Sequence, residues 1–180
     1  MDNISALPKR KHPRLSDFDY SAEGVYFVTI CTQNKRCLLS NIVGRGFTPA
    51  EEYEHLGSVR SVVELTPYGK IAEEQLFLLE ERFSGLAVDE YVIMPNHIHV
   101  IFSINTETAG VNPRPTIMDI VCAYKSLTTR ECKKIKPIKK LFQTSFYEHI
   151  IRNEKDYNET VAYISENPDK WLFDKLYSEE

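Results

Sequence analysis

His97 and His99 are separated by one residue within a stretch rich in β-branched and aromatic side chains, residues 97–103. If this stretch is a strand, both imidazoles point to the same face, about 6–7 Å apart along the backbone, and can converge on one divalent cation. A histidine pair of this kind is also compatible with two surface side chains that make ordinary hydrogen bonds. The apolar Ile98 and the strand that follows favour a metal site, because they would hold both rings rigidly on the sheet.

Tyr163 and Asn167 lie four residues apart in a predicted helix, so they share one helical face. If this helix packs near the histidines, Asn167 would offer a neutral oxygen as a third ligand, with the Tyr163 hydroxyl one turn away. Two imidazoles and an amide oxygen, with open coordination positions, suit Mg²⁺ or Mn²⁺ carrying phosphate oxygens. Spacing alone favours a core role for Tyr163 and a plain helix end at Asn167 over a functional role for either.

The elements that must position these residues alternate between strands and helices. Runs of β-branched and aromatic residues predict strands at residues 24–32, 91–94, 97–103 and 145–151. Apolar residues at helical spacing predict helices at residues 66–83, 116–134 and 153–166. Residues 33–66 form a long connection that could include a short hairpin.

This order of elements predicts an α+β fold. Without the last helix it is the ferredoxin-like βαββαβ arrangement, in which helices cover one face of an antiparallel sheet and leave the other face open for a site. The last helix, which carries Tyr163, is expected as a C-terminal catalytic helix near the hairpin that carries the histidines.

The 180 residues suit a single domain, with residues 1–22 as an irregular N-terminal arm. No apolar run approaches the ~20 residues of a membrane span, and no apolar stretch follows the charged N-terminus, so we expect neither a membrane helix nor a signal peptide. The four cysteines lack the spacing of a zinc site and are expected as free thiols in the cytoplasm. They are Cys31, Cys37, Cys122 and Cys132.

The net charge of −4 does not by itself indicate a partner that is a polyanion, but the basic residues are clustered. Screening limits the reach of remote charges to about 8–10 Å, so a local basic face can bind phosphates on an acidic protein. The set predicted to bind phosphates comprises Lys125, Arg130, Lys133, Lys134, Lys136, Lys139, Lys140, Arg152, Lys9, Arg10, Lys11 and Arg14. A solvated helix face followed by a loop would give the same pattern.

Several segments combine into a larger pattern. Residues 91–102 read YVIMPNHIHVIF, residues 146–152 read FYEHIIR, and residues 163–171 read YISENPDKW. The first is similar to the HUH motif of the IS200-like transposases, and the other two, with residues 19–33, resemble the REP-associated tyrosine transposases of that family. In one departure, Phe142-Gln143 stands where many relatives carry Trp-Gln, which puts a core or stacking contact in question.

The resemblance implies an enzyme that cleaves and rejoins single-stranded DNA near imperfect hairpins. It assigns His97 and His99 as metal ligands, Asn167 as a polar ligand, and Tyr163 as the nucleophile that forms a 5′-phosphotyrosine link. The implied cofactor is Mg²⁺ or Mn²⁺, the implied partner is single-stranded or hairpin DNA, and the implied assembly is a monomer or a homodimer. The basic residues would then bind the DNA backbone.

Two other functions fit the same residues. The first is a metal-dependent hydrolase that uses water as its nucleophile, in which His149 could join the histidine pair from a neighbouring strand. The second is a non-catalytic module that binds single-stranded nucleic acid on an open, aromatic sheet face.

Overall fold

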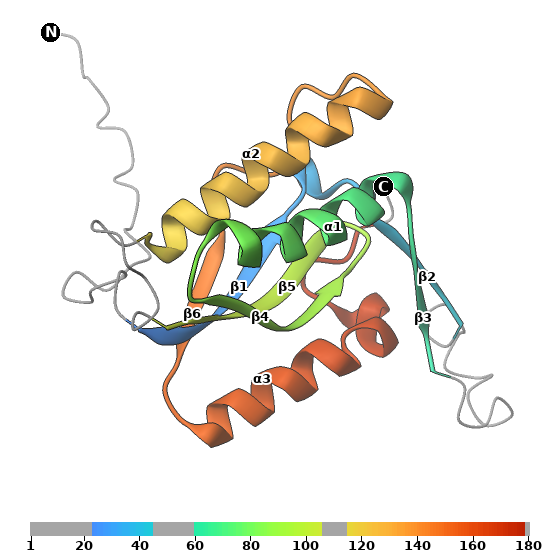
Figure 1. Cartoon of the computed structure of the whole chain (residues 1–180). Helices are drawn as coiled ribbons and strands as arrows, with labels where there is room; N and C mark the ends of the chain where they lie inside the picture. The colour runs from blue at the N-terminus through green and yellow to red at the C-terminus, as the bar shows by residue number, and fades with distance from the viewer. Residues whose placement is uncertain (1–22, 45–59, 106–114, 179–180) are drawn as a thin grey trace, which may run out of the picture.

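The structure of the chain, a computed structural model, describes residues 23–44, 60–105 and 115–178. The expected N-terminal arm, residues 1–22, lies outside these ranges. The central sheet contains β1 (Gly24–Cys31), β4 (Leu86–Ile93), β5 (His97–Ile104) and β6 (Tyr147–Ile151). Its strands are antiparallel in the order β4-β5-β1-β6. Helices α1 (Pro67–Arg82) and α2 (Ile117–Ile135) cover one face (Figure 1). The predicted ferredoxin-like fold is confirmed.

Alternation along β1 and β5 separates the two faces of the sheet. Even-numbered residues, such as Val28 and Val100, are buried in the main core together with apolar side chains of α1 and α2. Odd-numbered residues, among them Phe27, His97 and His99, point to the opposite face, because successive side chains of a strand alternate. The prediction that both histidines share a face away from the main core is confirmed.

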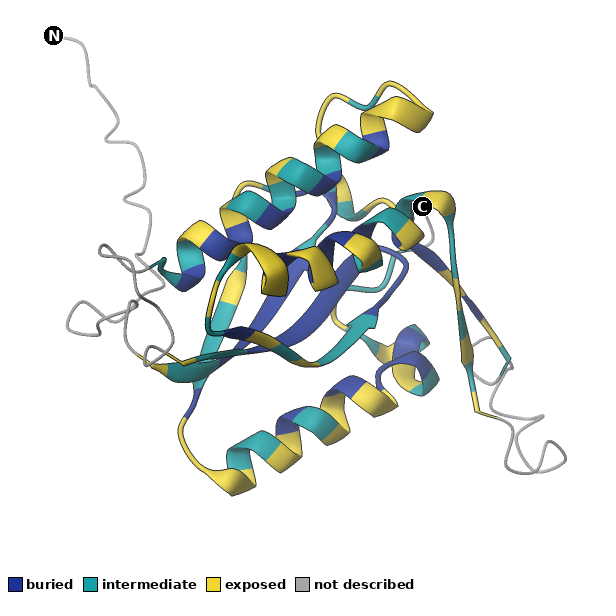
Figure 2. Cartoon of the chain, in the orientation of Figure 1, coloured by how far each residue is buried: buried dark blue, intermediate teal, exposed yellow. Residues whose placement is uncertain are grey.

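Helix α3 (Glu154–Glu166) covers this second face. Asn153 caps it as predicted, since its side chain accepts a hydrogen bond from the Asp156 amide at 2.9 Å. Ile164 packs with Phe27 and Ile101 in a small second core. Figure 2 shows the central strands buried between the two layers of helices. After α3, the 3₁₀ helix η4 (Pro168–Phe173) leads to a C-terminal segment whose Leu176 carbonyl accepts a hydrogen bond from the Asn96 side chain.

Several boundaries differ from the sequence predictions. β4 begins at Leu86 rather than near residue 91, and a register shift between Val88 and Glu90 breaks the alternation that sequence analysis relies on. The hairpin anticipated in the long connection is present as β2 (Ser40–Val43) and β3 (Val62–Leu65). Phe142 is buried in the main core, with its ring 5.9 Å from that of Tyr124.

No helix within the described part of the chain is both long and apolar enough to cross a membrane.

The turn that precedes His97 is held by the backbone at the start of β2. The amides of Leu38 and Leu39 both donate to the Pro95 carbonyl, at 2.9 Å each. Thr66, the N-cap of α1, donates its hydroxyl to the Leu38 carbonyl at 2.6 Å and its amide to the Leu39 carbonyl at 2.9 Å. The first turn of α1 therefore packs against the same backbone segment that supports the histidine turn.

Gly69 makes this close packing possible, because a Cβ atom at this position would overlap the carbonyl oxygen of Leu39. We expect Gly69→Ala to lower the free energy of unfolding by at least about 2 kcal/mol, measured by urea denaturation, since backbone atoms must move to admit the methyl group. Lys70→Ala, the adjacent exposed position, is the control and should change stability by less than about 0.5 kcal/mol. Equal stability of the two variants would contradict this account.

Candidate active site

The imidazole rings of His97 and His99 lie closer together than the distance of about 6–7 Å between their positions along the strand. Their ring centroids are 4.5 Å apart, and both side chains are buried, with His97 at 0% and His99 at 2% exposure. On β1 they face Cys31 and Thr29 respectively. Burial lowers the pKa of each imidazole to about 3, so both rings are neutral at pH 7, the form that ligates metal ions.

Hydrogen bonds fix the orientation of both rings. His97 Nδ1 lies 2.8 Å from Asn96 Oδ1, while the Asn96 amide nitrogen donates to the carbonyls of Leu176 and Lys35. Asn96 Oδ1 is thus the acceptor, His97 Nδ1 carries the proton, and His97 Nε2 keeps its lone pair. His99 Nδ1 lies 2.8 Å from the Thr29 hydroxyl. Polar partners on the far nitrogen are the usual support of metal-binding histidines.

Two atoms at this site lack hydrogen-bond partners within the described residues. They are His97 Nε2 and Asn167 Oδ1, and both are buried. Burial is the main cause of the lowered pKa of His97, and the nearby Asn167 side chain acts in the opposite direction. Leaving a buried polar atom unpaired costs about 1–3 kcal/mol. A cation that accepts both lone pairs would remove that penalty, so these residues fit a metal ion.

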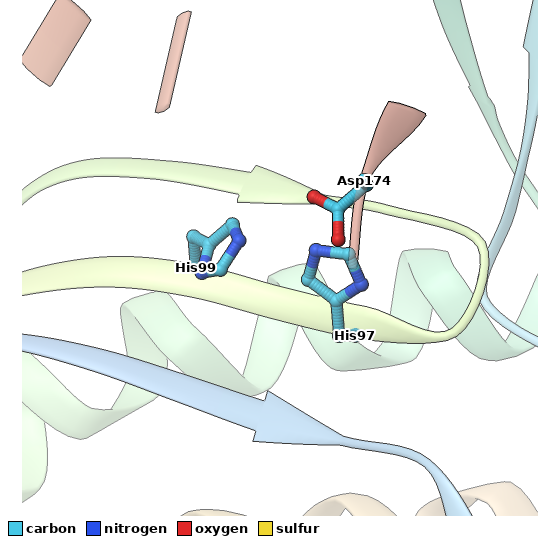
Figure 3. Close-up of side chains that lie close together, drawn as sticks. All are labelled: His97, His99 and Asp174. Atoms are coloured by element: carbon cyan, nitrogen blue, oxygen red, sulfur yellow. The ribbon is translucent and has the colours of Figure 1, made fainter. Parts of the chain in front are cut away.

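Asp174 adds a carboxylate that the sequence analysis did not identify. Ligand atoms of Asp174, His97 and His99 all lie within 4.8 Å of one another (Figure 3). Asn167 also touches this carboxylate, because its Nδ2 donates to Asp174 Oδ2 at 3.0 Å. The site therefore gathers two imidazoles, one amide oxygen and one carboxylate, a mixture suited to a divalent metal.

Trp171 explains why Asp174 lies near the histidines although no spacing rule connects them. This side chain is buried with Ile42 and Met94, and its ring lies 5.9 Å from that of His97. It anchors η4 next to the turn that precedes His97. Asp174, three residues later, is thereby brought close to the imidazole nitrogens of His97 and His99. The one sequence signal was the single Trp of the chain, three residues before Asp174.

Tyr163 lies beside His99. Its hydroxyl oxygen is 3.4 Å from His99 Nε2, and the Phe27 ring contacts both side chains, with centroids 5.2 Å from His99 and 6.0 Å from Tyr163. Burial and the Asp174 carboxylate raise the pKa of the phenol, so it is protonated at pH 7. The side chain is nevertheless 46% exposed, so a ligand can reach the hydroxyl.

A cleft of about 700 Å³ opens over these groups. Its floor includes Phe27, Thr29 and His99, and Tyr163 and Asp174 stand at its sides. The opposite wall is the segment that leads into β6, residues 143–147. The cleft is therefore the route by which a substrate could reach His99 and Tyr163 together.

Most of the basic residues predicted to bind phosphates lie away from this cleft. Arg130, Lys133 and Lys134 belong to α2, which lies on the other face of the sheet from α3 (Figure 1). Lys136, Lys139 and Lys140 follow α2 in the connection to β6. Arg152 is exposed just before α3. The N-terminal cluster Lys9, Arg10, Lys11 and Arg14 falls outside the described residues.

Lys125 has a different environment from the other basic residues. Its ammonium group donates to the carbonyls of Gln143, Thr144 and Ser145, at 3.1, 3.3 and 2.9 Å. A lysine has three donors, so these bonds can use all of them. Burial lowers its pKa to about 8. Lys125 therefore holds the wall of the cleft.

His149 is not among the residues that converge on the metal-facing atoms. Its Nε2 pairs with the Asp156 carboxylate at 2.9 Å, beside Tyr163 on the same face of the sheet. Within the described residues, the group whose ligand atoms converge consists of His97, His99 and Asp174 and does not include His149. The alternative in which His149 joins the histidine pair from the neighbouring strand is therefore not supported. All four cysteines are free.

Comparison with known proteins places the chain among related sequences. An uncharacterized protein of Haemophilus influenzae is 32% identical over 188 residues, covering 96% of each chain. The chain belongs to the same family as this protein. A REP-associated tyrosine transposase of Escherichia coli K12 is 31% identical over 83 residues, which cover 46% of this chain and 44% of that protein. No protein-family model matches the chain.

The fold is that of a solved transposase. The structure of a REP-associated tyrosine transposase bound to a REP hairpin aligns with a TM-score of 0.55 and 21% identity, covering 87% of this chain and 74% of that one. Together with the similarity to the Escherichia coli protein, this confirms the resemblance to the REP-associated tyrosine transposases.

The geometry leads to a prediction about metal binding. In calorimetric titrations with Mn²⁺, we expect His97→Ala and His99→Ala each to weaken binding at least about tenfold, because each removes a donor atom. Asp174→Asn measures how much the Asp174 carboxylate contributes to Mn²⁺ affinity. The matched control is Glu166→Gln, which removes an exposed carboxylate paired with Lys170. Unchanged Mn²⁺ affinity in the double histidine variant would rule out this site.

Proposed function

We propose that residues 1–180 form one IS200-like transposase domain that cleaves single-stranded DNA and transfers the cut strand through a 5′-phosphotyrosine intermediate. The observation that carries this proposal is the position of the Tyr163 hydroxyl, 3.4 Å from His99 Nε2 and on the edge of an open cleft. An exposed phenol beside two neutral, convergent imidazoles places a nucleophile next to a group suited to hold a phosphate through a metal ion.

His97, His99 and Asn167 would hold Mg²⁺ or Mn²⁺, with Asp174 as a further oxygen ligand. The ion would supply Lewis-acid stabilisation of the charge on the scissile phosphate. The donor set supports this role, since His97 Nε2 and Asn167 Oδ1 are buried without partners among the described residues.

Tyr163 would attack the phosphorus of the scissile phosphodiester. A bond forms between the phenolic oxygen and phosphorus, the bond to the 3′ oxygen breaks, the phenol loses its proton, and the departing 3′ oxygen gains one. One phosphodiester replaces another, so the step is reversible and the 3′-hydroxyl can attack again to rejoin strands. Because burial raises the pKa of Tyr163, nearby positive charge is needed to favour the phenolate.

The DNA proposed as partner is a hairpin with a single-stranded flank. The solved transposase with a similar fold is bound to a REP hairpin, which supports a substrate of the same class here. Lysines on α2 and on the connection to β6 would bind its backbone, while the single-stranded flank reaches the cleft on the other face. We therefore expect the DNA to pass around the β6 edge of the sheet.

Tyr163→Phe should abolish formation of a covalent adduct with DNA while leaving noncovalent binding within about twofold, because only the attacking oxygen is lost. The assay uses hairpin DNA labelled at its 3′ end, Mn²⁺ and denaturing gels. Tyr157→Phe, on the same helix, is the matched control and should form adduct at the wild-type rate.

Adduct formation by Tyr163→Phe at the wild-type rate would overturn the assignment of the nucleophile. Cleavage by the wild type without any adduct would instead indicate a hydrolase that uses water. Binding without cleavage would indicate a module that only binds DNA.

DNA contacts by the lysines at the end of α2 and in the connection to β6 can be detected from the salt dependence of the binding affinity. Each lysine that contacts a phosphate of a single strand contributes about −0.7 to the slope of log affinity against log salt. Replacing Lys133, Lys136 and Lys140 together by Ala should therefore flatten the slope by about two units, and should weaken binding to all sequences alike. Lys125→Met should leave the slope unchanged and lower thermal stability, because its donors are bound to carbonyls. A reversed pattern would place the backbone contact at Lys125.

A further inference from the structure

The edge strand β6 presents an exposed aromatic ring next to the candidate active site. Tyr147 is 60% exposed. On β1, Thr29 is paired with His99 of β5 on one side and with Tyr147 of β6 on the other. The three side chains therefore form one row across the face that α3 covers. Since neighbouring strands are about 4.8 Å apart, the Cα atom of Tyr147 lies roughly 10 Å from that of His99.

Tyr147 borders two hollows that meet at the nucleophile. The first is the cleft over His99, whose lining also includes Asp174 and Lys175. The second, of about 320 Å³, is lined by His149, Asp156, Glu159 and Thr160. Phe27, Tyr147 and Tyr163 line both hollows, so these rings form the boundary between them.

The charges of the two hollows favour different parts of a nucleotide. Asp156 and Glu159 place two carboxylates in the second hollow, which disfavours a phosphate there. Lys175 lines the first together with Asp174, whose negative charge a bound metal ion would offset. A strand whose phosphate lies at His99 and Tyr163 can thus turn a base, rather than a second phosphate, toward the ring of Tyr147. Proteins commonly hold single strands in this way, with the backbone in a polar groove and bases stacked on aromatic side chains.

We propose that Tyr147 is a stacking platform for one nucleobase of a single-stranded DNA segment, adjacent to the phosphate that Tyr163 attacks. This inference rests on the proposed function of the same site. Every base has an aromatic face, so the contact positions the strand without selecting its sequence. Tyr147 is therefore a binding residue that sets which phosphate reaches Tyr163.

The test measures equilibrium binding of single-stranded oligonucleotides by fluorescence anisotropy. Tyr147→Thr removes the ring and keeps a residue that favours strands, while Tyr147→Phe keeps the ring. We expect Tyr147→Thr to weaken binding roughly 5- to 150-fold, and Tyr147→Phe by less than about twofold. The matched control is Phe77→Ala, which removes a 46% exposed aromatic ring from α1, on the other side of the sheet.

Oligonucleotides with a single abasic position, moved one nucleotide at a time, locate the contact. At one position the missing base should weaken wild-type binding about as much as Tyr147→Thr does, and should have no further effect in that variant. Wild-type affinity in Tyr147→Thr, or additive losses at every abasic position, would overturn the inference. If Tyr147→Thr binds as the wild type while Tyr163 still forms adducts, the inference alone fails. If the wild type binds no single-stranded DNA, the proposed function fails with it.

Discussion

The side chain of Asn96 joins the parts of the molecule that must meet at the candidate site. Its oxygen accepts a hydrogen bond from His97 Nδ1, and its nitrogen donates to the Leu176 carbonyl in the C-terminal segment. Its backbone carbonyl accepts from both the amide and the hydroxyl of Thr32, at the end of β1. One fully buried residue thus sets the direction of the His97 lone pair through its side chain, the end of β1 through its backbone carbonyl, and the position of the residues after η4. The other contacts of the site depend on this arrangement.

The fold was largely predictable because its signals are local. Alternation in β1 and β5, the Thr66-Pro67 helix start and the Asn153 cap each involve residues within one turn or one strand. The start of β4 was placed too late, since its irregularity between Val88 and Glu90 hides the period of two. The helix α3 was correctly ended at Pro168, but η4 was not anticipated, because its position depends on where Trp171 finds a buried contact.

The site was predictable in part for the same reason. His97 and His99, and likewise Tyr163 and Asn167, are short-range pairs whose shared faces follow from strand and helix geometry, although their roles came from resemblance. Asp174 reaches the histidines only through tertiary packing, and the one nearby sequence signal is Trp171, three residues before it. Lys125 shows the opposite case. Its charge suggested a phosphate contact, whereas the carbonyls of residues 143–145 occupy its donors.

Because the chain is synthesised from its N-terminus, the residues of the candidate site become available at different times. The sheet, with both histidines, is complete once β6 has been synthesised, whereas Tyr163, Asn167 and Asp174 all belong to the segment that follows. This segment leaves the ribosome after β6, and domains begin to fold from the N-terminal side during synthesis. A growing chain can therefore carry a folded sheet before Tyr163 reaches its place beside His99. The candidate site is therefore complete only after the segment that carries Tyr163, Asn167 and Asp174 has been synthesised and has packed on the sheet.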